Sequence, residues 1–412
     1  MIEFDRFILD NGLRVLVHKD NSTPLAVVNV MYDVGSKDED ENKTGLAHLF
    51  EHLMFGGSIN IADYDDPLQM AGGENNAYTT HDVTNYYCQL PAQNIETAFW
   101  LESDRMLNLA FNKKSLNTQR KVVCEEFKEH YINKPYGNAW HKLRDLAYTT
   151  HPYKWMIIGK ELSHIQKVQL RDVKEFFSKH YCPANAVLVV SGNVKTEEIK
   201  RLTKKWFENI PMGEKYIREL PQEPEQQAPR LLQAVGDVPL DALYKAWHMS
   251  SRLEKGYYAS DLITEILGSG ESSRLYQSLV KEKQLFSNIA CHHFGNVEKD
   301  LLAIEGKLVK GIKMENAEKA IEDELEKIMN EPVNEQELEK VKNKTESIIA
   351  FEDMSIASRA NSLAFYEILG NANLMNEELR NYHAITVEDI LQYSKQIFNK
   401  NNSSTLQYFS KN

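Results

Sequence analysis

Apolar residues at the start of the chain form two short runs and then a longer one. Residues 7–18, FILDNGLRVLVH, place Asn11-Gly12 between two β-like runs, which predicts a hairpin with a two-residue turn. Residues 25–35, LAVVNVMYDVG, are apolar almost throughout, as is typical of a central strand covered on one or both faces. We therefore expect a sheet to begin in this region.

A helical pattern follows the polar loop at residues 38–45, DEDENKTG. Thr44 stands where a helix N-cap is expected, so the stretch 45–57, GLAHLFEHLMFGG, is predicted to be a helix that begins at Thr44. This helix carries two histidines and a glutamate among apolar residues.

Strands and helices are mixed along the rest of the first half. Residues 74–90 indicate two strands with a turn near His81-Asp82, and residues 94–111 predict an amphipathic helix. Another long helix is expected from Lys113 until Lys134-Pro135 ends it, and residues 185–194 return to a strand. This order favours an α+β fold.

Two domains are expected, because 412 residues exceed the size at which one core usually keeps growing. Residues 210–230 carry four prolines, are polar and lack periodicity, which is typical of a linker. We therefore predict a first half at 1–212, a linker at 213–229 and a second half at 230–412.

An internal comparison indicates that the two halves are copies of one fold. The segment from Val168, VQLRDVKEFFSKHYCPANAVLVV, matches the segment from Ile385, ITVEDILQYSKQIFNKNNSSTLQYF, at an offset of 217 residues. Each segment predicts a helix that leads into a strand. The pairs are Asp172 with Asp389, Phe176 with Tyr393, Tyr181 with Phe398, and Asn185 with Asn402.

Composition and charge narrow the class of protein. The net charge of −12 disfavours nucleic acid and anionic membranes as partners. Four cysteines without CxxC spacing are too few for a disulfide scaffold and are interpreted as reduced thiols. The sequence contains no pattern of a signal peptide and no apolar window of about 20 residues, so neither a signal nor a transmembrane segment is predicted.

The helix at residues 45–57 has the spacing of a metal site. His48 and His52 are four residues apart, so both imidazoles project from one face and could grip one tetrahedral ion. Glu51 lies beside His52, where it could accept a proton from a metal-bound water that attacks a carbonyl. The segment opposite these residues in the second half contains no histidine, so the metal chemistry is not duplicated.

A catalytic zinc site needs a third protein ligand. The long helix from Lys113 offers four candidates, and spacing alone does not choose among Glu125, Glu126, Glu129 and His130. The H-x-x-E-H pattern also arises by chance, although burying two histidines and a glutamate without a shared partner would be costly.

The order H-x-x-E-H resembles that of the inverzincins, and the chain resembles the pitrilysin family of zinc metallopeptidases over nearly its whole length. It is similar to the half-size, processing-protease-like bacterial subunits. The segments that carry the resemblance are GLAHLFEHLMFGGS, GGENNAYTTHDVTNYY, QRKVVCEEFKEHY, HYCPANAVLVVSGN and SSRLYQSLVKEKQL.

The resemblance implies a fold, a cofactor and a set of site residues. The fold would be two similar halves, each a mixed, mainly antiparallel sheet with helices packed on it, which form a clamshell. One Zn²⁺ per chain would be held by His48, His52 and Glu126, with Glu51 as the general base. Gln119, seven positions before Glu126, replaces a glutamate that is frequent in the family, and it could still orient a ligand.

The implied activity is that of an endopeptidase that cleaves short or unfolded peptides. By resemblance, an extended peptide would lie along the strand edge that contains Asn76, Ala77 and Tyr78. The family's substrate-binding arginine and tyrosine are replaced by Val280 and Ser287. We therefore predict that this chain is the zinc-bearing subunit of a heterodimer, with a homodimer less favoured, and that a homologous partner without zinc supplies the pair.

Two other readings of the sequence remain. Some relatives of this fold are non-catalytic scaffolding or peptide-binding subunits, but these typically lack the histidines. The motif alone would also permit a metallohydrolase that acts on something other than peptides. The expected location is the cytoplasm or periplasm of a bacterial-type cell.

Overall fold

The computed structural model describes residues 1–214 and 216–411, and it divides into two compact units. The first unit comprises residues 1–126, 157–219 and 349–378, and the second comprises residues 127–156, 220–348 and 379–412. Lys215 in the predicted linker and Asn412 at the end of the predicted second half lie outside the described residues. Each unit therefore contains segments from both sides of the predicted linker. The boundaries 1–212, 213–229 and 230–412 describe the two sequence repeats rather than the compact units, and they stay a prediction.

The first unit is built on a six-stranded sheet with the order β1-β2-β6-β3-β5-β4. Only the β2–β6 pair is parallel among these strands, as the parallel register of Arg14 with Val187 shows. The predicted hairpin is present, with Gly12 at a φ of 84° between its strands, but the predicted two-residue turn is wrong, because residues 9–13 separate β1 from β2. The strands are β1 (Asp5–Ile8), β2 (Arg14–Lys19), β3 (Leu25–Tyr32), β4 (Glu74–Thr79), β5 (Thr84–Pro91) and β6 (Ala186–Gly192).

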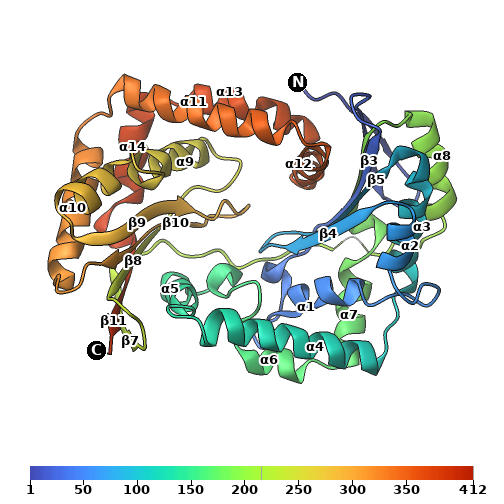
Figure 1. Ribbon diagram of the computed structural model, residues 1–412, viewed down its shortest axis with the longest axis horizontal. Helices are drawn as coiled ribbons and strands as arrows, with labels where there is room; N and C mark the ends of the chain where they lie inside the picture. The colour runs from blue at the N-terminus through green and yellow to red at the C-terminus, as the bar shows by residue number, and fades with distance from the viewer. Residues whose placement is uncertain (215, 412) are drawn as a thin grey trace. The chain divides into compact units, whose positions relative to one another are not determined.

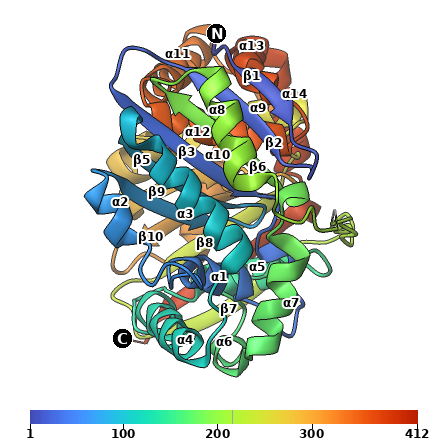
Figure 2. The same ribbon diagram turned by 90° about the vertical axis from the view of Figure 1, so that its right-hand side faces the viewer.

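Helices cover both faces of this sheet (Figures 1 and 2). Helices α3 (Ile95–Asn108) and α8 (Thr196–Phe207) lie on one face, and α12 (Ile356–Ile368) lies on the other. The apolar side of α12, including Ala360 and Leu363, is buried against strands β2, β3 and β6. The other helices of this unit are α1 (Leu46–Met54), α2 (Asp65–Met70), α4 (Lys113–Phe127), α6 (Leu162–Lys167) and α7 (Leu170–His180).

The second unit is built on a five-stranded sheet with the order β7-β11-β8-β10-β9. Its strands are β7 (Arg230–Gly236), β8 (Ala242–His248), β9 (Phe286–His293), β10 (Leu301–Leu308) and β11 (Ser403–Ser410). Helix α5 (Ala139–Ala147) packs on one face through residues such as Leu143, and α9 (Lys255–Gly268), α10 (Met314–Asn330) and α14 (Val387–Ile397) belong to the other face (Figure 1). Helices α11 (Glu335–Glu352) and α13 (Glu378–His383) and the π-helical turns η3 (Lys128–Ile132) and η6 (Tyr276–Glu282) complete the unit.

The two sheets have the same topology, which confirms the α+β fold with two similar halves. The order β2-β6-β3-β5-β4 in the first sheet corresponds strand for strand to β7-β11-β8-β10-β9 in the second. In each sheet the single parallel pair joins the first of these strands to the last strand along the chain, β2 with β6 and β7 with β11. The 217-residue offset is therefore the offset of a structural repeat.

Residues matched at that offset make matched contacts. The Asp172 carboxylate accepts a hydrogen bond from the N–H of Gln169 at 2.9 Å, and Asp389 accepts one from Thr386 at the same distance. Each aspartate therefore caps the N-terminus of its helix. Lys43 pairs with Asp172 at 2.9 Å, as Lys255 does with Asp389 at 2.7 Å.

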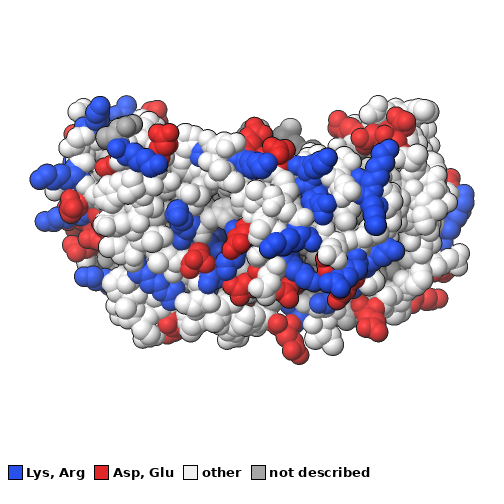
Figure 3. Space-filling view, turned by 90° about the horizontal axis from the view of Figure 1, so that it is seen from below, with Lys and Arg blue, Asp and Glu red and all other residues white. Residues whose placement is uncertain are grey.

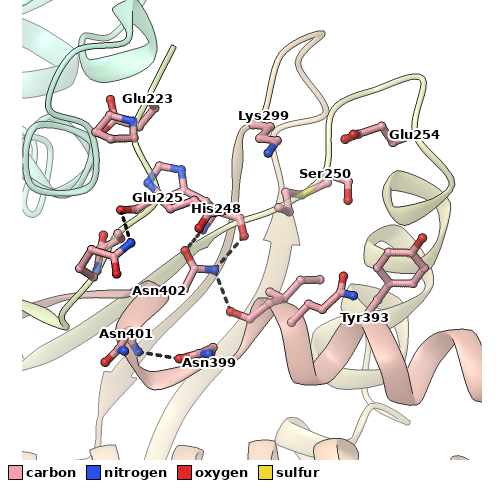
Figure 4. Close-up of a pocket in the computed structure, with 16 residues that line it drawn as sticks. Glu223, Glu225, His248, Ser250, Glu254, Lys299, Tyr393, Asn399, Asn401 and Asn402 are labelled. Carbon is pink, nitrogen blue, oxygen red and sulfur yellow. Dashed lines mark hydrogen bonds between the residues drawn. The ribbon is translucent and has the colours of Figure 1, made fainter.

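The paired asparagines repeat this pattern at the other end of each helix. The Asn185 side chain donates to the His180 and Asp33 carbonyls at 2.9 and 3.1 Å. In the second unit, the Asn402 side chain donates to the carbonyls of Ile397 and His248, both at 2.9 Å (Figure 4). Asn402 lies in the wall of a polar pocket of about 550 Å³ that the amide side chains Asn399 and Asn401 also line.

Charges of both signs are mixed on the face of the molecule in Figure 3. On the face in Figure 3, Lys and Arg side chains are interspersed with Asp and Glu side chains rather than gathered in one patch. All four cysteines, Cys88, Cys124, Cys182 and Cys291, are buried, and none of them forms a disulfide. No helix within the described residues is long and apolar enough to cross a membrane.

Candidate metal centre

Helix α1 carries the residues with the candidate chemistry. Its apolar residues Leu46, Leu49, Phe50 and Leu53 are buried, which fixes the rotation of the helix and leaves the histidines on the partly open side. The side chains of His48 and His52 are 17% and 22% exposed, and their ring centroids are 4.9 Å apart. The helical spacing thus brings both imidazoles to one solvent-accessible place.

The N-terminus of α1 is held by a carboxylate from the preceding loop. Glu39 is buried and accepts hydrogen bonds from the N–H groups of Gly45 at 2.8 Å and Ala47 at 2.7 Å. A negative charge at this end also interacts favourably with the helix dipole. Glu39 therefore caps the N-terminus of α1 in place of the residue at the N-cap position.

The prediction that Thr44 caps α1 is wrong. The cap residue is Gly45, which has a φ of 86°, a conformation that favours glycine. An added Cβ at Gly45 would lie 2.5 Å from the carbonyl oxygen of Ile158, so a side chain would not fit either. The Thr44 hydroxyl instead contacts His164 Nδ1 at 2.9 Å and accepts a hydrogen bond from the N–H of Lys160 at 2.7 Å.

Helix α4 brings a third group to the two histidines. The Oε2 atom of Glu126 lies 3.3 Å from Nε2 of His52 and 3.9 Å from Nε2 of His48. One potential ligand atom from each of the three residues lies within 4.8 Å of the other two. Among the His, Cys, Asp and Glu side chains of the described residues, His48, His52 and Glu126 form the group that could hold a metal ion. Glu125, Glu129 and His130, the other candidates on this segment, are not part of it.

The three side chains fit a divalent metal. Glu126 Oε2 and His48 Nδ1 are buried and have no hydrogen-bond partner among the described residues. An unsatisfied buried carboxylate oxygen is costly, and an ion shared with two imidazoles would satisfy it. Two imidazoles and one carboxylate are also a donor set that suits zinc and leaves further positions open.

The surroundings of His48 favour the neutral form of its imidazole ring. Burial and the neighbouring His52 lower the pKa of His48 to about 4. The His48 ring is therefore neutral at neutral pH, and a neutral imidazole is the form that coordinates a metal.

Glu51 lies beside this set and contacts strand β4. Its Oε2 atom accepts a hydrogen bond from the Thr79 hydroxyl at 2.5 Å. Burial raises the pKa of Glu51 above its ordinary value, and the hydrogen bond from Thr79 opposes part of that rise. Glu51 is thus a carboxylate with a raised pKa, held at one oxygen, next to a group of potential metal ligands.

The turn after β4 is clamped to the loop that precedes α1. Lys37 and Asp82 form a buried ion pair at 2.7 Å, and the N–H of Lys37 donates to the His81 carbonyl at 3.0 Å. An added Cβ at Gly35 would lie 2.3 Å from that carbonyl oxygen, so only glycine allows this close approach. The clamp holds the end of β4, and with it Thr79, in place relative to α1.

The remaining predicted site residues lie near this centre within the first unit. Gln119 is half-buried on α4, two helical turns before Glu126, so the two share a face of the helix. Asn76, Ala77 and Tyr78 lie on β4, the terminal strand of the sheet, where the Asn76 side-chain oxygen accepts a hydrogen bond from the N–H of Ala77 at 2.8 Å. The roles of these residues stay predictions.

The two substituted positions lie in the second unit. Val280 is half-buried in η6, and Ser287 is exposed on β9, where its hydroxyl donates to the carbonyl of Lys307 at 3.1 Å. An aliphatic side chain and a short hydroxyl cannot replace the long hydrogen-bonding side chains of an arginine and a tyrosine.

Sequence reasoning missed two residues of the centre, Glu39 and Thr79. Glu39 falls in a run of acidic residues that has no periodicity, so nothing in the sequence distinguishes it from its neighbours. Thr79 had a usable signal, because the alternation of a strand places residues 77 and 79 on the same face of β4.

Comparisons with known proteins show the family of the chain. Residues 14–157 match the model of the insulinase family, peptidase family M16, and residues 167–345 match the model of the M16 inactive domain. The chain belongs to peptidase family M16, the pitrilysin and insulinase family of metalloendopeptidases. The family model for the inactive domain covers a part of the chain that lies after the candidate metal ligands.

Individual relatives match this chain over nearly its full length. The zinc protease PqqE of Helicobacter pylori is 29% identical over 404 residues, which are 97% of this chain and 91% of that protein. The crystal structure of a protease from Helicobacter pylori has a TM-score of 0.92 at 28% identity and covers 99% of this chain and 100% of its own. Pitrilysin shares the fold, with a TM-score of 0.78 at 18% identity over 100% of this chain and 45% of the pitrilysin chain.

Proposed function

We propose that this M16 metalloendopeptidase is zinc-dependent, uses Glu51 as its general base, cleaves short or unfolded peptides and works with a homologous partner subunit. The observation that carries the proposal is the convergence of His48, His52 and Glu126 within 4.8 Å, beside a glutamate held by Thr79. The relative PqqE, which aligns over 97% of the chain, is named a zinc protease.

His48, His52 and Glu126 would hold one zinc ion. When bound, zinc supplies Lewis acidity that polarises water and the scissile carbonyl. Glu51 moves the proton: its carboxylate accepts a proton from the attacking water while the new C–O bond forms, and it passes that proton to the amine as the C–N bond breaks. The raised pKa of Glu51 suits both halves of this transfer, because it brings the group closer to neutral pH.

The peptide would bind as an added strand on β4. That strand is at the end of the sheet order, so its outer backbone groups are not used by a neighbouring strand of the sheet. Asn76, Ala77 and Tyr78 would contact the peptide there. A backbone-paired substrate must be extended, which favours short or unfolded chains.

The partner would supply the arginine and tyrosine whose positions Val280 and Ser287 occupy here. The chain also spans 45% of the pitrilysin chain with the same fold, which is the relation expected if one subunit corresponds to half of a longer enzyme. A heterodimer of a zinc-bearing and a zinc-free subunit would follow. The proposed location is the cytoplasm or periplasm of a bacterial cell, since the full-length relatives are bacterial.

Substitution of the base tests the mechanism. Glu51→Gln keeps the size of the side chain but cannot accept the proton, so peptide cleavage should fall by about 10²- to 10⁴-fold while zinc content is unchanged. The measurement is cleavage of a quenched peptide library, together with metal analysis. Glu129→Gln, which removes an exposed carboxylate outside the ligand group, is the control. Unchanged cleavage by Glu51→Gln would remove Glu51 from the mechanism.

Metal analysis separates the enzyme from the alternative of a non-catalytic scaffolding or peptide-binding subunit. A scaffold has no need of an ion, whereas the enzyme should bind one zinc per chain and lose activity to a chelator. Zinc-free purified protein that takes up no zinc on titration would favour the scaffold.

A further inference from the structure

We infer that Thr79 is a positioning residue for cleavage: its hydroxyl holds one oxygen of Glu51 and leaves the other oriented for proton transfer. The inference rests on the proposed role of Glu51 as the base. The observation that carries it is the 2.5 Å hydrogen bond from Thr79 Oγ1 to Glu51 Oε2.

The hydrogen bond needs a fixed donor, because a carboxylate on a helix can rotate about its side-chain bonds. Thr79 is the last residue of β4 and is paired with Thr84 of β5 across the hairpin. A β-branched side chain in a strand has few χ1 rotamers, so few directions are open to the hydroxyl. Both residues of the hydrogen bond are half-buried, which limits competition from water.

The turn beyond Thr79 makes this donor rigid. The Thr80 hydroxyl accepts hydrogen bonds from the N–H groups of Asp82 and Val83, both at 3.0 Å, which closes the turn. The buried ion pair of Asp82 with Lys37 ties that turn to the loop before α1. Loop, turn and strand therefore place the Thr79 hydroxyl relative to the helix that carries Glu51.

A group held in the reactive geometry before the reaction lowers the barrier, and a misplacement of about 1 Å can cost about a hundredfold in rate. A hydrogen bond to a charged acceptor contributes an amount that corresponds to about ten- to a hundredfold in rate. Loss of the Thr79 hydroxyl should therefore reduce kcat by about ten- to a hundredfold and leave KM nearly unchanged, because the hydroxyl contacts the base and not the peptide.

The test compares Thr79→Val with Thr79→Ser. Valine has the shape of threonine and favours a strand, but it has no hydroxyl, whereas serine keeps the hydroxyl and loses the methyl group. We expect a low kcat for Thr79→Val, near-normal kcat for Thr79→Ser and normal zinc content in both. The assay uses the preparation that is active, either the chain alone or the chain with its partner subunit.

Thr84→Val is the matched control. It makes the same chemical change on the neighbouring strand, where the Thr84 hydroxyl donates to the Val34 carbonyl at 2.9 Å and does not contact Glu51 in the hydrogen bonds described. Thr84→Val should lower thermal stability but leave kcat unchanged. A fall in kcat equal to that of Thr79→Val would show that any loss of a hydroxyl from this hairpin is harmful, and it would overturn the inference.

A double variant separates this inference from the proposed function. If Thr79 acts through Glu51, adding Thr79→Val to Glu51→Gln should cause no further loss. Normal activity of Glu51→Gln would overturn the proposed function itself. An impaired Glu51→Gln with a fully active Thr79→Val, or with a loss that multiplies in the double variant, would overturn only the role of Thr79.

A measurement without turnover covers the case in which Thr79→Val fails to fold or loses zinc. In threonine-methyl-labelled protein, the Thr79 methyl resonance should shift by more than the other threonine resonances when Glu51→Ala removes the acceptor. The resonance is assigned from its absence in Thr79→Ser. An unshifted Thr79 methyl would show that the hydrogen bond is absent and would overturn the inference.

Discussion

At the scale of single residues, metal binding by the candidate ligand group should depend most on one carboxylate oxygen, Oε2 of Glu126. Glu126 Oε2 is buried, has no hydrogen-bond partner among the described residues and lies 3.3 and 3.9 Å from the Nε2 atoms of His52 and His48. Such an atom is destabilising in the metal-free protein and stabilising once an ion is bound. Most of the metal affinity should therefore depend on Glu126, whereas residues that only orient it should contribute less.

Glu126→Gln and Gln119→Ala test this difference. Glu126→Gln should weaken zinc binding by more than about a hundredfold, because it removes a ligand, and Gln119→Ala by about ten- to a hundredfold, the range for groups that orient a ligand. Competition with a fluorescent chelator measures both affinities. Glu125→Gln, a change at the adjacent position, should bind zinc as the unmodified chain does. Equal affinities of Glu125→Gln and Glu126→Gln would contradict the assignment.

At the scale of elements, helix α1 depends on a loop for its start. It is nine residues long, begins after a glycine with positive φ and has no side-chain cap of its own. Short isolated helices are marginal in water, so the contacts at its ends and on its buried face determine whether it forms. Glu39 satisfies two of its otherwise unpaired N–H groups.

Glu39→Gln should therefore weaken both folding and metal binding. The substitution removes the charge at the helix N-terminus and one of the two acceptor oxygens, which should cost about 1 kcal/mol of unfolding free energy. Thermal denaturation of the zinc-free and zinc-bound protein is the measurement. Glu41→Gln is the control on the same loop, because Glu41 is exposed and forms an ion pair with Lys160. A stability loss as large in Glu41→Gln would argue against a capping role.

The elements also show what the sequence could predict. Helix and strand periodicities are local, so the hairpin, the strand of residues 25–35 and the His48–His52 pair were predicted from the residues alone. The cap of α1 was not, because the residue that leaves no room for a side chain at Gly45 is Ile158, which lies far along the chain. Choosing Glu126 among four candidates required the family resemblance, since 74 residues separate it from His52.

At the scale of the whole molecule, hydrogen bonds connect the segment that follows α8 to the loop at residues 149–151. The Glu223 carboxylate accepts hydrogen bonds from the N–H groups of Thr149, Thr150 and His151, at 2.8 to 3.0 Å. Burial raises the pKa of Glu223, but these hydrogen bonds outweigh burial and lower the pKa from 4.5 to about 2. The ionised carboxylate is therefore the form that the folded second unit favours.

This pKa shift predicts how stability depends on pH. Since the folded-state pKa is the lower one, the contribution of Glu223 is complete above pH 4.5 and is lost as pH falls toward about 2. Glu223→Gln should thus be less stable than the unmodified chain at neutral pH, by about 1 kcal/mol after solvent screening, and this difference should disappear only below about pH 2. Urea unfolding across this range is the measurement, and a difference that does not depend on pH would contradict it.

The activity of the whole molecule should depend on a partner subunit. The chain should cleave the quenched peptide library weakly when purified alone and efficiently with a homologous subunit that carries the arginine and tyrosine absent at Val280 and Ser287. Co-purification from the source cell identifies that subunit. Full activity of the lone chain would defeat the split-site proposal.

The interleaved course of the chain has a consequence for its breakage. A cut between Glu219 and Leu220 would give two polypeptides, and neither would contain all of either compact unit. The front piece would lack α12, whose aliphatic side chains cover one face of the first sheet and contribute about 1.5–3 kcal/mol each when buried. The two pieces would therefore need each other to fold, so a protein nicked at this point would stay assembled and keep its metal centre.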